Sequence, residues 1–550
     1  MKKYLRLLAL LLCCALLSGC IPLSGNQELK EMGLTAYSDM IYIRPDMEKL
    51  EQSLDKALEA AAGTDFAAII QSIYDFYDIY DLFYTQYSLA DLRYSADLTD
   101  THWQEETDFC AANSPRVDAM LEELYYALAQ SPCLEQLEGE DYFGPGYFDS
   151  YQGENNWDAE FTALLEAQSE LTSRYYELSA AGAQYEEESE EYYQAVYEDM
   201  VNLLIELVKV RHDIAEYWGY KDYNAFAFDF SYYRDYTVEE SRKYLAQIRL
   251  ELVPLYRQIN ASGIWENAFQ ETTQEDTYKY VALMAKKMGG IVDEAFYAMN
   301  VCGLHDIGYG ENKYPSSFEV YLTTYNLPFV FMSPTMTTYD YLVFAHEFGH
   351  FCCDYAAYGS YAGMDVLEIF SQGMEYLSLC YGDGPEYLTK MKMADSLCLY
   401  VEQAAYAEFE MALYDLPEEE LTSDAIRKLY RQVAESYGFD SVGFDDREFV
   451  AITHYFTSPL YVLSYVVSND AALQLYQMEK ESISSGLPAW KKTWPPRNTI
   501  SSPSWIPPGS PAPSPRDGSS RCGSSLRKFS DNRIKTPPFG QATAKKGEIF

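Results

Sequence analysis

Apolar residues recur at three- and four-residue spacing through most of the chain between about residue 30 and residue 488. Clear examples are "MEKLEQSLDKALEAA", "YEDMVNLLIELVKVRHDIAEYWGY" and "ADSLCLYVEQAAYAEFEMALYDL", in which acidic and basic residues occupy the intervening positions. This spacing is typical of amphipathic helices that bury one face. No short-period repeat accompanies it, which argues against a solenoid. We therefore predict one mainly α-helical domain over residues 31–488.

One segment departs from the helical pattern. "SSFEVYLTTYNLPFVFMSP", from Ser316 to Pro334, is rich in β-branched and aromatic residues and is interrupted by "YNLP". Such a segment predicts two strands or a hairpin. An exposed edge of these strands can align an extended peptide through main-chain hydrogen bonds.

The first twenty residues, "MKKYLRLLALLLCCALLSGC", have a basic start, a short apolar run and small residues at the end. This predicts a secretory signal over residues 1–19. "LSGC" resembles the bacterial lipobox, so we expect Cys20 to be lipidated and residues 20–30 to be a linker. The alternative is an ordinary signal peptide with a chance cysteine. The expected location is the extracytoplasmic face of a bacterial cell membrane, with the lipid as the only anchor, because no later stretch is long and apolar enough to span a bilayer.

The chain is strongly acidic, with a formal net charge of -45. This charge argues against nucleic acid or an anionic membrane surface as a partner, and it favours a mildly cationic peptide. The eleven cysteines do not form a disulfide framework, because two lie in the signal, Cys20 is the expected lipid site, and Cys352 and Cys353 are adjacent. We expect the protein to be a monomer.

From about Trp490 the chain becomes basic and rich in Pro, Ser and Gly. This composition predicts a disordered, low-complexity tail over residues 489–550. Reading the codons one register over forces Glu at the junction of Trp490 and Lys491, and permissible codons elsewhere give acidic, helical sequence like that of the body. We therefore hypothesise that the residues after about Pro488 derive from a frameshift, which resequencing of the coding DNA would test.

The segment "TTYDYLVFAHEFGHFCCDYAAY" carries the candidate chemistry. Thr337 and Asp340 fit a capping box, which predicts a helix start near Thr337. His346 and His350 then lie one turn apart on one helix face and can share a metal ion, while Glu347 can reach a metal-bound water without being a ligand. The alternative is a packed core helix that contains this pattern by chance. The sequence favours a catalytic zinc site.

A catalytic zinc site usually has a third protein ligand. The downstream candidates are Asp354, Asp365, Glu368, Glu375 and His454. "MDVLEIFSQGMEYLSL" predicts the next helix, in which Glu368 and Glu375 are two turns apart on one face. Spacing alone does not choose between them.

"AHEFGHFCC" followed by "MDVLEIFSQGMEYL" resembles the thimet oligopeptidase and oligoendopeptidase F family of zinc metallopeptidases. In that family, a glutamate in an Asp-x-x-Glu-x-x-Ser-Gln pattern is the third zinc ligand. The resemblance therefore implies one Zn²⁺ ion held by His346, His350 and Glu368. Glu375 matches a second acidic position of the pattern and is expected to support the ligands.

A third match lies at "ITHYFTSPLYVLSYVVSNDAA". His454, Tyr461 and Tyr465 share one face if this stretch is helical, although Pro459 favours a helix that begins near the proline. The resemblance implies that they face the zinc and hydrogen-bond the tetrahedral intermediate, and one such donor stabilises developing charge by ~3 kcal/mol. The alternative for either tyrosine is simple packing.

The resemblance also implies a mainly α, two-lobed zincin-type fold with a small β-hairpin beside the active-site helix and a deep substrate channel. We accordingly predict a zinc-dependent endopeptidase that hydrolyses short unfolded peptides, with Glu347 as general base. Two alternatives stay open. One is a peptide-binding surface lipoprotein without hydrolytic activity, and the other is a peptidase inactivated by the frameshift.

Overall fold

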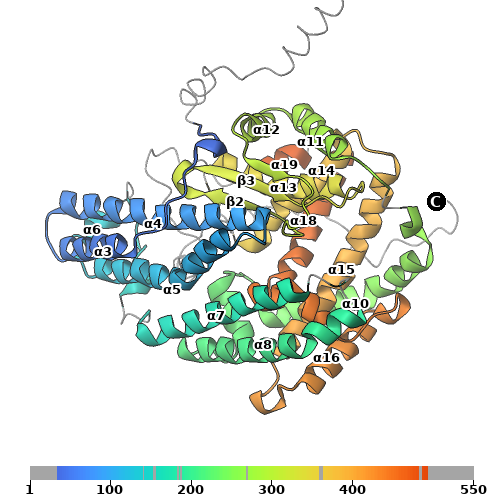
Figure 1. Cartoon of the computed structure of the whole chain (residues 1–550), viewed down its shortest axis with the longest axis horizontal. Helices are drawn as coiled ribbons and strands as arrows, with labels where there is room; N and C mark the ends of the chain where they lie inside the picture. The colour runs from blue at the N-terminus through green and yellow to red at the C-terminus, as the bar shows by residue number, and fades with distance from the viewer. Residues whose placement is uncertain are drawn as a thin grey trace, which may run out of the picture.

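A computed structural model describes residues 34–139, 142–152, 157–182, 185, 189–267, 270–357, 359, 363–481 and 486–493. The predicted signal peptide, Cys20, the linker and residues 494–550 lie outside the described residues. The described part is mainly α-helical, as the apolar periodicity predicts, with one small sheet (Figure 1).

Helices account for most of the described chain, and several begin at a side chain that accepts a hydrogen bond from a first-turn amide. Asp46 and Asp65 cap α3 and α4 in this way, and Thr237 with Glu240 forms a capping box at α10. The α-helices are Met47–Ala61 (α3), Phe66–Ala96 (α4), Thr101–Ala129 (α5), Leu134–Leu137 (α6), Ala159–Gly182 (α7), Glu190–Tyr217 (α8), Tyr223–Phe226 (α9), Val238–Ala261 (α10), Gln274–Met288 (α11), Ile291–Val301 (α12), Asp340–Ala357 (α13), Met364–Tyr381 (α14), Tyr387–Leu413 (α15), Ser423–Ser436 (α16), Thr453–Thr457 (α17), Val462–Glu481 (α18) and Gly486–Thr493 (α19).

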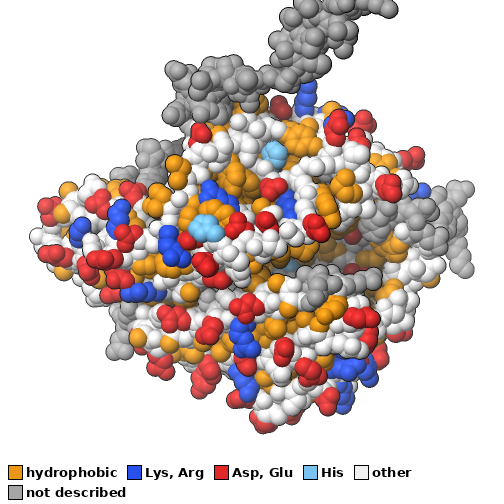
Figure 2. Space-filling view, viewed as in Figure 1, with side chains coloured by type: hydrophobic (Ala, Val, Ile, Leu, Met, Phe, Trp, Pro, Cys, Tyr) orange, Lys and Arg blue, Asp and Glu red, His pale blue; other side chains and the backbone are white. Residues whose placement is uncertain are grey.

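The buried apolar residues form three clusters. One lies among α3 to α6, and a second among α7 to α10, α16 and α17. The third joins α11 to α14, the sheet and α19, and both α15 and α18 contribute to the second and third clusters. In Figure 1 helices α7, α8, α10 and α16, which carry the second cluster, lie below α11 to α14, which carry the third, and Figure 2 shows a groove between these two parts of the molecule.

The sheet has three strands in the order β1-β3-β2. The predicted hairpin is present as Ser317–Leu322 (β2) and Leu327–Met332 (β3), which pair antiparallel, with Asn326 at a φ of 51° in the turn. His305–Ile307 (β1) pairs parallel to β3 and was not predicted, because three residues are too few for a periodic signal. β1 and β2 are the two edge strands, and α13 packs against β2 and β3.

The start of α13 corrects the prediction from the capping box. The helix begins at Asp340 and not near Thr337. Residues 336–338 instead pair with an extended segment: the Thr338 amide donates to the Gln270 carbonyl at 2.9 Å, and Glu271 and Thr337 form an isolated bridge. The Asp340 carboxylate accepts from the amides of Thr335 and Met336, both at 2.9 Å, and so closes the turn that leads into the helix.

The predicted boundary at residue 488 falls inside α19. Trp490 on this helix is fully buried, and its indole N–H donates to the Phe370 carbonyl at 3.2 Å. The edge of the indole lies against Gly373, where a Cβ would come within 2.9 Å of it. The described structure thus extends five residues beyond the predicted boundary, while the frameshift hypothesis stays a prediction. Among the described helices, none is long and apolar enough to cross a membrane.

Candidate metal centre

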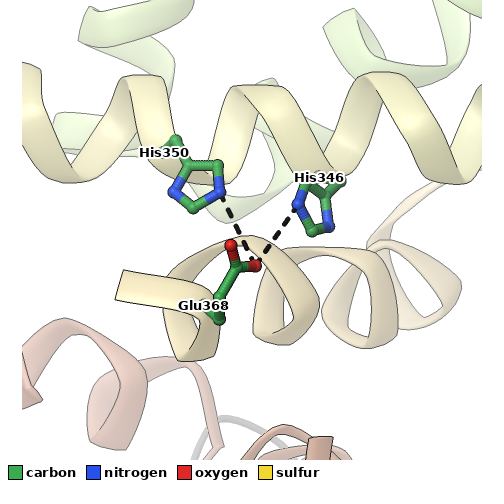
Figure 3. A group of neighbouring side chains, drawn as sticks. All are labelled: His346, His350 and Glu368. Carbon is green, nitrogen blue, oxygen red and sulfur yellow. Dashed lines mark ion pairs between the residues drawn. The ribbon is translucent and has the colours of Figure 1, made fainter. Parts of the chain in front are cut away.

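The site is built on the close contact between α13 and α14. Gly349 lies at this contact, where a Cβ would be 2.6 Å from the Phe370 carbonyl oxygen and 2.7 Å from the Cα of Ser371. Only glycine lets the two backbones approach this closely. As a result His346 and His350 point from one face of α13 toward Glu368 on α14 (Figure 3).

The three donor groups converge on one point. Nε2 of His346 lies 3.5 Å from Oε2 of Glu368, and Nε2 of His350 lies 3.8 Å from the same oxygen. One donor atom from each residue lies within 4.8 Å of the others. Metal–ligand distances of about 2.0–2.2 Å in a tetrahedral zinc site separate the ligand atoms by about 3.3–3.6 Å. The spacing and the donor types of this group therefore fit a zinc ion.

The other candidates for a third ligand are engaged differently. Asp365 pairs with Arg234 at 3.3 Å, and Glu375 pairs with Lys392 at 2.6 Å. Asp354 and His454 are not part of the His346, His350 and Glu368 group. Spacing left the third ligand open, and of these candidates Glu368 lies beside both histidines in the structure.

Glu375 supports one of those histidines. Its Oε1 lies 2.8 Å from Nδ1 of His346 and can accept a hydrogen bond from the Nδ1 proton, which fixes the ring with Nε2 turned toward Glu368. The ammonium of Lys392, which is 1 % exposed, balances the charge of Glu375. Burial by itself would raise the pKa of Glu375, but Lys392 and His346 hold it below its usual value. Lys392 was missed by the sequence reasoning, although a single lysine on the apolar side of "MKMADSLCLY" is the signal that could have found it.

Burial and neighbouring charges shift the pKa values of His346, His350 and Glu347 in different directions. Burial opposes a charge on His346, but the hydrogen bond to Glu375 and the nearby carboxylates prevail and raise its pKa to about 9. Burial lowers the pKa of His350 to about 4, which keeps its imidazole neutral. Burial, together with the charges of Glu368 and Glu375 and against that of His346, raises the pKa of Glu347 to about 7. A carboxyl group with a pKa near neutrality can both accept and return a proton.

His454, Tyr461 and Tyr465 do not share one helix. α17 ends at Thr457 and α18 begins at Val462, and Leu460 between them has a φ of 63°. The one-helix-face argument is therefore wrong, and Pro459 marks the interruption as its chemistry predicts.

The three side chains nevertheless converge next to Glu368. The Tyr461 hydroxyl donates to Oε1 of Glu368 at 2.5 Å, and Nε2 of His454 lies 3.3 Å from the Tyr465 hydroxyl. The rings of Tyr461 and Tyr465 are 5.2 Å apart. Burial and the charge of Glu368 raise the pKa of both phenols, and burial lowers the pKa of His454. All three groups are thus neutral at pH 7, and the phenols are hydrogen-bond donors.

Comparisons with known proteins agree with this geometry. The family model of the peptidase M3 N-terminal domain matches residues 37–157. No curated protein sequence matches the chain.

Three solved structures share the fold. PZ peptidase A with inhibitor 2 has a TM-score of 0.73 and 21 % identity, over 83 % of this chain and 92 % of that one. A protein assigned as oligoendopeptidase F, from crystals grown by microfluidic seeding, has a TM-score of 0.72 and 20 % identity, over 84 % and 92 %. A further assigned oligoendopeptidase F, from Bacillus anthracis strain Ames, has a TM-score of 0.69 and 22 % identity, over 84 % and 91 %.

Identities this low establish a common fold, and the family model adds a sequence match to the peptidase M3 N-terminal domain over residues 37–157. The M3 N-terminal domain and the oligoendopeptidase fold together confirm that this chain resembles the oligoendopeptidase F family of M3 peptidases, as its motifs predict.

Proposed function

We propose that the protein is a zinc-dependent endopeptidase that hydrolyses short, unfolded peptides. The observation that carries this proposal is the convergence of His346, His350 and Glu368 from two helices onto one point, with ligand-like spacing. A Zn²⁺ ion bound there would polarise the scissile carbonyl and lower the pKa of water.

Glu347 is the general base of the proposal. It follows His346 directly in α13, is buried, and has a pKa raised to about 7. At neutral pH its carboxylate accepts the proton of the attacking water and then returns that proton to the leaving amine nitrogen.

Tyr461, Tyr465 and His454 supply the hydrogen bonds for the charge that develops on the former carbonyl oxygen. The Tyr461 hydroxyl already reaches Glu368, and Tyr465 and His454 lie beside it. Positioned donors of this kind contribute ~3 kcal/mol each to transition-state stabilisation. Tyr461 is the leading candidate, because its hydroxyl lies against Glu368; its single hydrogen, now donated to Glu368, would turn to the substrate oxygen.

The substrate class follows from access and charge. The groove in Figure 2 and the edge strand β2 next to α13 favour an extended peptide that adds main-chain hydrogen bonds to the strand. The net charge of -45 favours a neutral or cationic peptide over an acidic one.

Lipid anchoring at Cys20 on the extracytoplasmic face of a bacterial membrane belongs to the proposal as well. Its support is the signal sequence and the lipobox-like "LSGC" alone. Metabolic labelling with a palmitate analogue tests it: label that disappears with Cys20→Ala is the expected result, and label that persists contradicts the anchor site.

Hydrolysis of a quenched fluorescent peptide library tests the enzymatic proposal. We expect one zinc ion per chain by elemental analysis, loss of cleavage with a chelator and recovery with zinc. Glu347→Gln should lower kcat by roughly 10²–10⁴-fold. Glu251→Gln, at an exposed position of α10, is the matched control and should leave cleavage unchanged.

The contrary outcomes separate the alternatives. Full activity of Glu347→Gln contradicts the mechanism. Peptide binding with neither zinc nor cleavage favours a binding lipoprotein. Bound zinc without cleavage, together with activity in a frame-restored version, favours an enzyme damaged after about residue 488.

A further inference from the structure

An irregular segment between α9 and α10 lies against the candidate site. Residues Ala227–Ser231 form a short π-helix, and Tyr233 follows with a φ of 49°. A π-helix and a positive φ at a residue other than glycine are both uncommon and raise the free energy of the backbone, so they persist only where surrounding contacts stabilise them. The segment directs Tyr232 and Arg234 toward the loop before α18, and Tyr236 toward α14.

The Arg234 side chain is fully buried and bridges two elements. Its Nη2 donates to the Leu460 carbonyl and to the Ser464 hydroxyl oxygen, each at 3.1 Å, and to Oδ1 of Asp365 at 3.3 Å. The guanidinium also lies 4.3 Å from the ring centre of Tyr232. These contacts join the first turn of α14 to the loop that leads into α18.

The partners of Arg234 flank two site residues. Asp365 lies three residues before Glu368 in α14, while Leu460 and Ser464 lie on either side of Tyr461. Each hydrogen-bond partner of Arg234 is therefore within one helical turn of a site residue.

The loop before Tyr461 needs such support. Leu460 has a φ of 63°, a backbone conformation that residues other than glycine rarely adopt. The Tyr232 hydroxyl donates to the preceding carbonyl, that of Pro459, at 2.6 Å. Two neighbouring side chains of one segment thus hold two successive carbonyls of the strained loop.

We propose that Arg234 is a positioning residue, which holds the Tyr461 hydroxyl against Glu368 by tying the loop 459–461 to the first turn of α14. The proposal rests on the proposed function only for the role of Tyr461 as a donor to the substrate oxygen. Lysine is expected to replace Arg234 poorly, because an ammonium lacks the second nitrogen, Nε, that reaches Asp365 at 3.4 Å and the planar group that lies 4.3 Å from the ring centre of Tyr232.

A double-mutant cycle tests whether Arg234 acts through Tyr461. Arg234→Lys is made in the full chain and again in a Tyr461→Phe background, with kcat and KM measured per bound zinc. We expect Arg234→Lys to lower kcat by roughly 10- to 100-fold with KM within about twofold, as for a donor displaced by about 1 Å. In the Tyr461→Phe background the same change should lower kcat by less than about threefold, because interacting residues are not additive.

Arg257→Lys is the matched control. Arg257 forms an exposed ion pair with Asp440 at the end of α10, and its replacement should leave kcat unchanged in both backgrounds. Equal losses from Arg234→Lys with and without the Tyr461 hydroxyl would overturn the proposal, and so would an unchanged kcat.

Two further measurements keep the test decisive. If Arg234→Lys does not fold, Tyr232→Phe removes only the hydroxyl that holds Pro459, and it must show the same dependence on Tyr461. If the wild-type protein does not cleave peptides, the kinetic cycle has no readout, and that result bears on the proposed function alone. Amide hydrogen exchange of residues 453–464 then decides: faster exchange in Arg234→Lys but not in Arg257→Lys supports the positioning role, and equal exchange overturns it.

Discussion

One imidazole ring links the two acidic positions of α14: Nδ1 of His346 lies 2.8 Å from Glu375, and Nε2 of the same ring lies 3.5 Å from Glu368. The two glutamates are seven residues apart, so they occupy the same helix face two turns from each other. Glu368 thereby contributes to the candidate metal group, while Glu375 fixes the orientation of one of its histidines.

Replacing Glu375 should weaken metal binding. In Glu375→Gln the charged partner of His346 is lost and Lys392 loses its closest counter-ion. We expect the affinity for zinc to fall by roughly 10- to 100-fold, as for other outer-shell partners of histidine ligands. Competition with a chromogenic chelator measures this, and Glu251→Gln on the surface of α10 provides the control. An affinity equal to that of wild type would show that Glu375 does not orient His346.

The glycine between the histidines should tolerate no side chain. Gly349→Ala places a Cβ 2.6 Å from the Phe370 carbonyl oxygen, so α13 and α14 must move apart. We expect a loss of about 1–3 kcal/mol of unfolding free energy from overpacking, together with weaker zinc binding. Gly443→Ala is a useful comparison, because no atom lies within 4 Å of its added Cβ, although its φ of 78° adds local strain. Weakened zinc binding in Gly443→Ala as well would remove the link between helix spacing and the site.

The stability of the protein should depend on pH through Glu410. Burial raises the pKa of this carboxyl to about 8, against the lowering effects of Leu460, Arg211 and Arg234. Between its unfolded pKa of about 4.3 and pH 8 the folded state therefore holds a proton that the unfolded state has lost. Folded protein is then disfavoured as pH rises, by at most ~1.4 kcal/mol per pH unit.

Glu410→Gln removes this titration and keeps the shape of the protonated side chain. The variant should lose less stability than wild type between pH 5 and pH 8, so that its advantage in melting temperature grows with pH. Circular dichroism melts at several pH values measure this, and Glu251→Gln should keep the wild-type slope. Parallel slopes for wild type and Glu410→Gln would contradict the assigned pKa.

The last described helix should contribute to stability. Trp490 is fully buried between α14 and α18, against Gly373 and Leu475. Trp490→Ala should therefore cost about 3–5 kcal/mol of unfolding free energy. Tyr309→Ala removes a ring that is 79 % exposed and should stay within about 0.5 kcal/mol of wild type. Equal stability of the two variants would mean that α19 does not pack as described.

Local signals were sufficient for much of the fold. The apolar spacing predicted the long helices, and "YNLP" between two β-rich runs predicted the β2–β3 hairpin. The i, i+4 spacing of His346 and His350 predicted their common face, because both lie within one helix. β1 was not predicted, and the start of α13 was predicted three residues too early, since each depends on pairing with a segment distant in sequence.

The sequence by itself determined which residues have the chemistry of a metal site, namely two histidines one turn apart, a glutamate between them and acids on the next helix. The tertiary structure decided how they are used. The close approach of α13 and α14 at Gly349 places Glu368 beside the two histidines. Glu375 contacts His346 and Lys392. Tyr461 reaches Glu368 from the non-helical loop between α17 and α18. These choices depend on distances between residues far apart in sequence, and periodicity carries no information about such distances.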